Sequence, residues 1–294
     1  MKDLEHKAIE RLKMAAQLSM AYYGKPLLLA YSGGKDSEAC LELCRRAGIP
    51  FEVVHNLTTA DAPETVWHVK KIFYRLELDG IRCEILYPEY KGRRVSMWTL
   101  IPQKLMPPTR VARYCCSVCK ERSGRGRMMA LGVRKFESQS RRDSAPAETQ
   151  GKSWKDREIF DFDNGDRQMF VHCMAKQKIK VHPIVEWTDR DVWSFLRDAK
   201  TELNPCYFMG FSRVGCVGCP MAGKGRWKEF RQWPKYETLY CRAFERMLAQ
   251  RREQGKNCQW RTGEEVFRWW MEDKNLDGQM DLFGGEIGGM KDGA

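Results

Sequence analysis

Apolar and polar residues follow two periods along the chain, one typical of helices and one typical of buried strands. Residues 2–23 carry apolar side chains at helical spacing and are followed by Gly24 and Pro26, so this segment is predicted to be an amphipathic helix. The short apolar run at 27–30 is predicted to be a strand. The same patterns predict further strands at 51–55, 83–86, 128–131 and 178–181, and further helices at 38–48, 63–73, 97–101 and 188–195.

Strands and helices alternate over most of the first 200 residues. This alternation argues for an α/β fold, in which a parallel sheet is covered by helices on both faces. The strand at 178–181 is predicted to lie at an edge of the sheet. Residues 139–166 are polar with few apolar positions, and a connection of this length predicts an excursion or a mobile flap.

The pattern changes after residue 200, where a cysteine-bearing loop precedes a long helix predicted at 234–254 and a second helix that begins near Thr262. The aromatic residues of both helices fall at helical spacing, which favours a buried core; base stacking is the alternative. The predicted division is an α/β nucleotide-binding domain at 1–200, a cysteine loop and helical region at 201–274, and a flexible glycine-rich tail at 275–294.

The turn between the first strand and the next helix combines glycines, hydroxyl groups and a lysine. Two glycines let the backbone approach an anion, and the helix N-terminus that follows favours negative charge. The turn is too short for the GxxxxGK[ST] loop that holds β- and γ-phosphates. A phosphate site is therefore predicted, with a turn that binds nothing as the alternative. Its residues are Ser32, Gly33, Gly34, Lys35, Asp36 and Ser37.

The sequence Ser-Gly-Gly-Lys-Asp-Ser at 32–37 resembles the PP-loop of ATP pyrophosphatases. In that family the loop holds the pyrophosphate end of ATP while the α-phosphate is attacked, and the products are AMP and pyrophosphate. The resemblance implies a parallel-sheet fold of the adenine nucleotide α-hydrolase type, with ATP as the ligand. It also implies that Lys35 is catalytic and that Mg²⁺ helps to stabilise the developing charge.

The composition narrows the class of partner. The 294 residues carry a formal net charge of +12, which suggests a nucleotide or a nucleic acid; a merely soluble basic surface is the alternative. The sequence has no apolar run of membrane-spanning length and no apolar signal core near its start, so a cytoplasmic protein is expected. Twelve cysteines in a reducing compartment favour metal, cluster or sulfur-transfer roles over disulfides.

Two groups of cysteines are candidates for metal ligands. A tandem pair, Cys115 and Cys116, and a CxxC pair, Cys216 and Cys219, together supply four thiolates. Four thiolates are enough to hold a [4Fe-4S] cluster. A tetrahedral zinc site and a redox-active CxxC are the alternatives.

A tandem pair followed by a CxxC resembles the sulfonucleotide reductase family, to which the phosphoadenosine phosphosulfate reductases belong. The resemblance covers residues 27–221 and implies that Arg134 meets phosphate oxygens, with a surface ion pair as the alternative. The other matching segments are Pro-Glu-Thr at 63–65, Gly-Val-Arg-Lys-Phe-Glu-Ser at 132–138, His-Pro-Ile-Val-Glu-Trp-Thr at 182–188, and Asn204, Pro205, Tyr207 and Arg213 before the CxxC.

The chain departs from the reductases in its cysteines. Those enzymes carry a nucleophilic cysteine in a C-terminal Glu-Cys-Gly-x-His motif, which this sequence lacks; its last cysteine, Cys258, lies in Asn-Cys-Gln-Trp. Cys119 and Cys206 are additional to the four presumed ligands. Each could replace a ligand or carry a persulfide, and an inert buried thiol is the favoured interpretation of both.

Without the reductase cysteine, the chain is most similar in character to the DNA phosphorothioation ATP pyrophosphatases. This resemblance implies that an acceptor oxygen attacks the α-phosphate of ATP and that sulfur then displaces AMP. The expected partners are a nucleic acid, with DNA favoured over tRNA, and a cysteine desulfurase or another sulfur donor. A sulfonucleotide reductase that uses another thiol is the first alternative. A nucleotide-sensing or DNA-associated binding protein without turnover is the second.

The tail contains one further motif. Gln279-Met280-Asp281-Leu282-Phe283 resembles the Gln-x-x-Leu-Phe peptide by which bacterial proteins bind the DNA sliding clamp. The resemblance makes the clamp a candidate partner. The alternative is that the Leu-Phe pair packs against its own domain.

Overall fold

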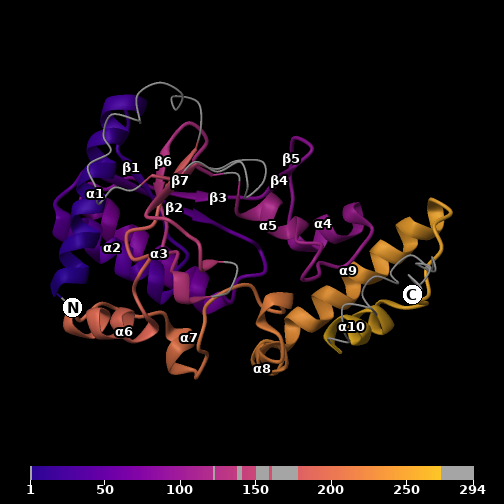
Figure 1. Cartoon of the computed structure of the whole chain (residues 1–294). Helices are drawn as coiled ribbons and strands as arrows, with labels where there is room; N and C mark the ends of the chain where they lie inside the picture. The colour runs from indigo at the N-terminus through magenta and orange to yellow at the C-terminus, as the bar shows by residue number, and fades with distance from the viewer. Residues whose placement is uncertain (1, 122, 138–140, 150–158, 161–177, 273–294) are drawn as a thin grey trace, which may run out of the picture. The chain divides into compact units, whose positions relative to one another are not determined.

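The computed structural model describes residues 2–121, 123–137, 141–149, 159–160 and 178–272 (Figure 1). The predicted clamp-binding motif at 279–283 and most of the predicted flap at 139–166 lie outside these residues. None of the described helices combines the length and the hydropathy that a bilayer crossing requires.

The contacts within the chain define two compact units. Unit 1 comprises Met1–Leu57, Pro63–Leu86 and Arg122–Gly215, and unit 2 comprises Thr58–Ala62, Tyr87–Glu121 and Cys216–Ala294. The predicted division at residue 200 places residues 87–121 in the first domain, whereas their contacts place them in unit 2. Both cysteine groups therefore belong to the same unit.

Unit 1 contains a seven-stranded, mainly parallel sheet. In chain order its strands are β1 (Leu27–Ala30), β2 (Phe51–Asn56), β3 (Cys83–Leu86), β6 (Met128–Ala130), β7 (Ala147–Thr149), β8 (Ile159–Phe160) and β9 (Ile179–Val181). Across the sheet the order is β3-β2-β1-β6-β9-β7-β8, and only the pairs that involve β7 are antiparallel. β1 is a central strand of the sheet, and three of its four residues are buried. Because a central parallel strand is covered on both faces, its residues form a continuous apolar run.

The prediction of an edge strand at 178–181 was wrong, because β9 lies between β6 and β7. Its neighbour β7 comes from the segment predicted to be a polar excursion. In β7 only alternate residues, Ala147 and Thr149, are buried. Three residues, one small and two polar, give too short a pattern to be recognised as a strand.

The helices of unit 1 are α1 (Lys2–Tyr23), α2 (Lys35–Ala47), α3 (Pro63–Leu78), α6 (Asp189–Asp198) and α7 (Pro205–Phe208). The predicted N-terminal helix is confirmed, and its apolar stripe lies in the core. Arg11 on α1 is also buried and donates two hydrogen bonds to the Glu186 carboxylate, at 2.5 and 2.6 Å. This bidentate pair fastens α1 to the segment that precedes α6.

Local signals set the ends of several helices. Gly48 follows α2 in the left-handed conformation (φ +62°), which glycine adopts without steric cost. At the start of α6, Thr188 and Asp191 form a reciprocal capping box, as the sequence predicts. These caps satisfy backbone groups that a helix end would otherwise leave unpaired.

Unit 2 is mostly helical. Its elements are the hairpin β4 (Glu89–Tyr90) and β5 (Arg93–Arg94), the helices α4 (Met97–Lys104), α5 (Tyr114–Cys119), α8 (Gly225–Gln232), α9 (Pro234–Glu253) and α10 (Gly263–Met271), and a 3-10 turn at Pro220–Ala222. The predicted helices at 234–254 and near 262 are confirmed. The core is aromatic, since Tyr240 of α9 packs against Trp270 of α10 and Phe230 of α8. Burial of these rings supports the core interpretation of the aromatic residues.

Candidate functional site

The loop at 32–37 connects β1 to α2, as predicted. Gly33 has φ +76°, and a Cβ there would lie only 3.1 Å from a methyl group of Val69, so glycine is favoured by both conformation and space. The Ser37 hydroxyl donates to the carbonyl of Gly34 at 2.8 Å and lies 3.1 Å from the Ser32 hydroxyl. The turn is thus closed by its own side chains next to the first turn of α2.

Two residues near 205 form hydrogen bonds with the backbone of this loop. The Asn204 amide donates to the carbonyl of Gly33 at 3.0 Å, and the backbone N–H of Lys35 donates to the Tyr207 hydroxyl at 2.7 Å. Tyr207 therefore occupies one of the helix N-terminal donors that an anion would use. Asn204 and Tyr207 were recognised in the sequence only as matching family positions.

Two cations and two carboxylates form a network beside the loop. The Lys35 ammonium lies 3.2 Å from both Asp36 and Asp189. The Arg134 guanidinium lies 2.6 Å from Asp36 and 2.9 Å from Asp189. Burial of the Asp189 carboxyl opposes its ionisation, but Lys35 and Arg134 outweigh this effect and its pKa is lowered.

Arg134 is buried, with 3% of its surface exposed. In addition to the two carboxylates, it donates to the carbonyl of Trp187. Its nitrogens therefore face protein groups, and its predicted contact with phosphate oxygens stays a prediction. In the structure, Arg134 positions Asp36 and Asp189 around Lys35. A close approach makes this arrangement possible, because a Cβ at Gly132 would lie 2.8 Å from the backbone of Asp36.

Arg134→Ala is expected to lower the free energy of unfolding by about 2 kcal/mol, because the buried arginine loses its charged hydrogen bonds to the half-buried Asp36 and the exposed Asp189, while Lys35 still pairs with both. Urea unfolding measures this change. Arg190→Ala, at an exposed arginine of α6, is the matched control and should change stability by less than about 0.5 kcal/mol. Unchanged stability in Arg134→Ala, with lost ATP binding, would instead assign Arg134 to the nucleotide.

A buried polar chain lies directly before the loop. The Tyr31 hydroxyl donates to Glu38 of α2 at 2.5 Å and accepts from His68 of α3 at 3.0 Å. Burial raises the pKa of Tyr31 well above its ordinary value, and the Glu38 charge raises it further. These bonds join the end of β1 to two helices and so hold the entry to the loop rigid. The sequence pattern gave no indication of this chain, because its members are distant along the sequence.

The four cysteines predicted as ligands belong to unit 2. Cys115 and Cys116 lie in the short helix α5, and Cys216 and Cys219 flank a turn at Gly218, which has φ +74°. Val217 donates through its backbone to Ala60 at 2.7 Å, which fixes this turn against residues 58–62. None of the described cysteines forms a disulfide.

The four thiols share one electrostatic environment. A hydrogen bond from Cys115 lowers the pKa of Cys116, and Arg113, 3.5 Å away, lowers it further. The pKa of Cys115 is raised by the same hydrogen bond, by burial and by the charges of Cys116, Cys216 and Cys219. Burial likewise raises the pKa of Cys216. Cys115 and Cys116 are therefore hydrogen-bonded to each other, and Cys216 and Cys219 lie near enough to Cys115 to influence it electrostatically.

Whether these thiols fit a metal depends on whether the bound group is a single ion or a cluster of several metal atoms. In the part of the chain that the structure describes, no three His, Cys, Asp or Glu side chains converge on one point as a single ion requires. Ligands of one zinc ion share a centre about 2.3 Å from each sulfur, whereas the ligands of a cluster bind different iron atoms and lie farther apart. Four neighbouring thiols beside the cationic Arg113 have the chemistry of an iron–sulfur donor set.

The two additional cysteines lie in different surroundings. Cys119, on α5, is buried, and burial raises its pKa to about 12. Cys206 belongs to unit 1, where it is buried beside the Thr65 hydroxyl at 3.7 Å. Neither arrangement exposes a thiol to substrate, which agrees with the favoured interpretation of both as buried thiols.

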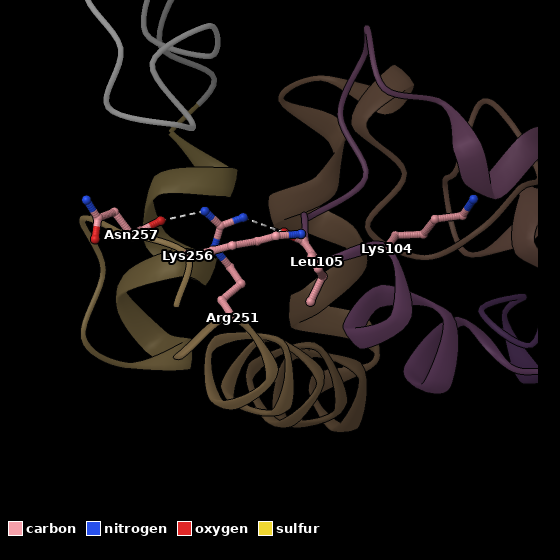
Figure 2. Close-up of a pocket in the computed structure, with 5 residues that line it drawn as sticks. All are labelled: Lys104, Leu105, Arg251, Lys256 and Asn257. Atoms are coloured by element: carbon pink, nitrogen blue, oxygen red, sulfur yellow. Dashed lines mark hydrogen bonds between the residues drawn. The ribbon is translucent and has the colours of Figure 1, made fainter. Parts of the chain in front are cut away.

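A surface pocket of about 420 Å³ lies elsewhere in unit 2 (Figure 2). Its lining includes three cationic side chains, but Arg251 donates to the carbonyls of Leu105 and Asn257 at 2.9 and 2.5 Å. Lys104 lies 4.1 Å from the ring of Tyr90. The pocket contains no residue of the loop or of the cysteine groups, and its arginine joins α4 to the segment after α9. We therefore assign it a structural role.

The parallel sheet and the loop at the carboxyl end of β1 define an α/β fold of the PP-loop, adenine nucleotide α-hydrolase-like class. More specifically, residues 26–222 match the family model described as "Phosphoadenosine phosphosulfate reductase domain", so the chain belongs to this family. The predicted membership of the phosphoadenosine phosphosulfate reductase-like family is thereby confirmed.

Relatives with curated names include two kinds of protein. An uncharacterized protein of Methanocaldococcus jannaschii is 25% identical over 73% of this chain, which covers 41% of that protein. An adenosine 5'-phosphosulfate reductase of Anoxybacillus flavithermus is 27% identical over 69% of this chain and 77% of its own length. The chain thus spans less than half of the archaeal relative and most of the reductase.

Among solved structures, phosphoadenylyl-sulfate reductase from Candida auris aligns with a TM-score of 0.47 and 16% identity. The alignment covers 71% of this chain and 88% of that one. A TM-score below 0.5 bears on neither substrate nor mechanism.

Proposed function

We propose that this protein is an ATP pyrophosphatase that cleaves ATP to AMP and pyrophosphate and uses the reaction to insert sulfur into nucleic acid, with DNA as the favoured acceptor. The observation that carries the proposal is the presence of four neighbouring thiols in a chain whose other unit has a PP-loop. Within the 294 residues no cysteine lies in a Glu-Cys-Gly-x-His context, which favours acceptor activation over reduction of a sulfonucleotide.

The proposed reaction has two displacements. An oxygen of the acceptor attacks the α-phosphorus of ATP, the bond to the bridging oxygen breaks, and pyrophosphate leaves with the electron pair. Sulfur at the oxidation level of sulfide then attacks the activated centre, and AMP leaves. Neither displacement changes an oxidation state. A persulfide donor, such as a cysteine desulfurase, would require two further electrons from a thiol reductant.

The residues of unit 1 supply charge and orientation. Lys35 and the loop N–H groups stabilise the negative charge that moves onto pyrophosphate, and Mg²⁺ would assist them. Arg134, through Asp36 and Asp189, fixes the position of the lysine. The Tyr207 hydroxyl leaves the Lys35 N–H when phosphate binds there.

The residues of unit 2 supply the cluster site. A [4Fe-4S] cluster held by Cys115, Cys116, Cys216 and Cys219 would, when bound, have a thiolate on each iron and would supply electrons, which reduction of a persulfide donor requires. Arg113 and the hydroxyl of Thr58, which accepts from Cys216 at 3.3 Å, orient two of these thiols. The described part of unit 2 is also basic, with 19 lysines and arginines against 10 aspartates and glutamates, which suits a polyanionic acceptor.

Product analysis of ATP with anaerobically prepared protein tests the proposal. We expect AMP and pyrophosphate in equal amounts, formed faster when DNA is present than when it is absent or replaced by tRNA. Formation of ADP, or no cleavage under any of these conditions, would contradict it.

A sulfonucleotide reductase is the second candidate, because several relatives are named adenosine 5'-phosphosulfate reductases. It requires an accessible nucleophilic thiol, for which Cys258 is the candidate, being half-buried in the described region of unit 2. This function would be favoured if the wild type released sulfite from adenylyl sulfate and Cys258→Ser did not.

A further inference from the structure

The outer face of α8 combines one aromatic ring with three cations. Trp227 is 51% exposed, and Lys224, Lys228 and Arg231 are also exposed. Positions three, four and seven residues apart share one side of a helix. The only acidic residue of α8, Glu229, points inward and is buried. This face, the α8 basic face, therefore carries three cationic side chains and no acidic side chain of α8 around an exposed tryptophan.

The inner side of α8 holds this face in place. Arg226 is buried and donates to the carbonyl of Trp270 at 2.8 Å, while Phe230 packs against Phe267 with a centroid distance of 5.0 Å. An exposed tryptophan on a helix anchored in this way is not needed for the core. Its exposure costs solvation free energy that a binding partner would recover.

The α8 basic face is also tied to the cysteine turn. Gly218, between Cys216 and Cys219, donates its backbone N–H to the Glu229 carboxylate at 2.7 Å. The chain passes from Cys219 through the 3-10 turn directly into α8. A molecule bound along α8 would therefore lie next to the loop that carries two of the thiols.

We propose that the α8 basic face binds an unpaired segment of DNA, with one base stacked on Trp227 and phosphates on the flanking cations. The assignment rests on the proposed function, since it places the sulfur acceptor beside the thiols. Charge complementarity selects a polyanion, and an exposed indole selects an unpaired base. Duplex DNA hides its base faces, so the face should prefer single strands.

A second exposed tryptophan provides the contrast. Trp67 on α3 is 77% exposed and also has lysines nearby, but Lys71 and Arg75 each pair with Glu202 at 2.7 Å. Lys71 and Arg75 share this one carboxylate, which offsets part of the charge of that surface. The surface at Trp67 is therefore less cationic than the α8 basic face, and Trp67 supplies a control at an exposed tryptophan.

Fluorescence anisotropy of a labelled 20-nucleotide single-stranded DNA with the full chain tests the proposal. We expect Trp227→Ala to weaken binding at least about fivefold, the lower range for loss of one stacked base, and Trp227→Tyr to restore most of it. Replacing Lys224, Lys228 and Arg231 by glutamine should reduce the slope of log affinity against log salt by about 2, since each single-strand phosphate contact contributes about 0.7.

Trp67→Ala should bind DNA like the wild type. The proposal would be overturned if Trp227→Ala bound DNA as tightly as the wild type, or if Trp67→Ala lost as much affinity as Trp227→Ala. It would also be overturned by tighter binding of duplex DNA, or by a more than tenfold preference for RNA of the same sequence. Near-ultraviolet circular dichroism of each variant shows that it is folded. The readout is independent of ATP: binding through Trp227 without ATP cleavage would refute the proposed reaction alone, whereas cleavage without such binding would refute this surface alone.

Discussion

Lys35→Ala is expected to lower the rate of AMP and pyrophosphate formation by about 10²- to 10³-fold, the range measured when one group that stabilises transition-state charge is removed. Lys35 lies at the first position of α2, and only 10% of its side chain is exposed. Its ammonium is held 3.2 Å from Asp36 and from Asp189 at the mouth of the loop. No other lysine in the described loop region of unit 1 takes part in this network, so the loss should be large.

Three comparisons make this result specific. Lys35→Arg keeps the charge but changes its geometry, and should retain part of the rate. Lys25→Ala removes an exposed lysine just before β1 and should leave the rate unchanged. Urea unfolding distinguishes lost catalysis from lost stability, because removal of Lys35 also removes one of the two cations that pair with Asp36 and Asp189. A rate in Lys35→Ala within about threefold of wild type would remove Lys35 from the mechanism.

Cys116→Ser and Cys216→Ser are each expected to abolish bound iron and the broad absorbance near ~400 nm that thiolate-ligated iron gives. Loss of a supporting group around a metal typically costs 10- to 100-fold in affinity, and loss of a ligand costs more. Both thiols belong to one electrostatic group of four, so either change leaves the donor set incomplete. Anaerobic purification with iron and sulfide analysis measures the outcome.

Cysteines outside this group supply the controls. Cys241→Ser on α9 and Cys258→Ser should retain full iron content, since neither belongs to the tandem pair or to the CxxC pair. If the wild-type protein were colourless and held one zinc per chain, and if both substitutions removed that zinc, the site would be a zinc site and not an iron–sulfur cluster. Iron retained in Cys216→Ser would refute the ligand set.

The features that the sequence predicts correctly are local ones. The helix ends at Gly48 and Thr188 and the loop at 32–37 are determined by residues within one or two turns of each other. The family motifs also drew attention to the four cysteines, which the structure places in one unit, and their role as ligands stays a prediction. Patterns over a few residues suffice for such elements because the physical cause acts over the same distance.

The parts that sequence reasoning missed depend on contacts between distant residues. Asp189 reaches Lys35, and Tyr207 reaches the Lys35 N–H, across more than 150 positions of sequence. β9 is internal because β7 pairs with it, and β7 has too few apolar residues to be recognised. Asp189 follows the Trp-Thr of a recognised motif, which is the one signal that could have drawn attention to it.

The central claim is that ATP cleavage by this protein drives replacement of oxygen by sulfur in nucleic acid. The most direct measurement is mass spectrometry of nuclease-digested DNA after incubation with the protein, ATP, Mg²⁺ and sulfide. We predict a nucleotide product whose mass reflects exchange of one oxygen for sulfur, formed with one AMP per sulfur and absent when an ATP analogue that resists cleavage between the α- and β-phosphates is used. ATP-dependent AMP release with no sulfur in DNA or RNA, or sulfite release from adenylyl sulfate without ATP, would contradict the claim.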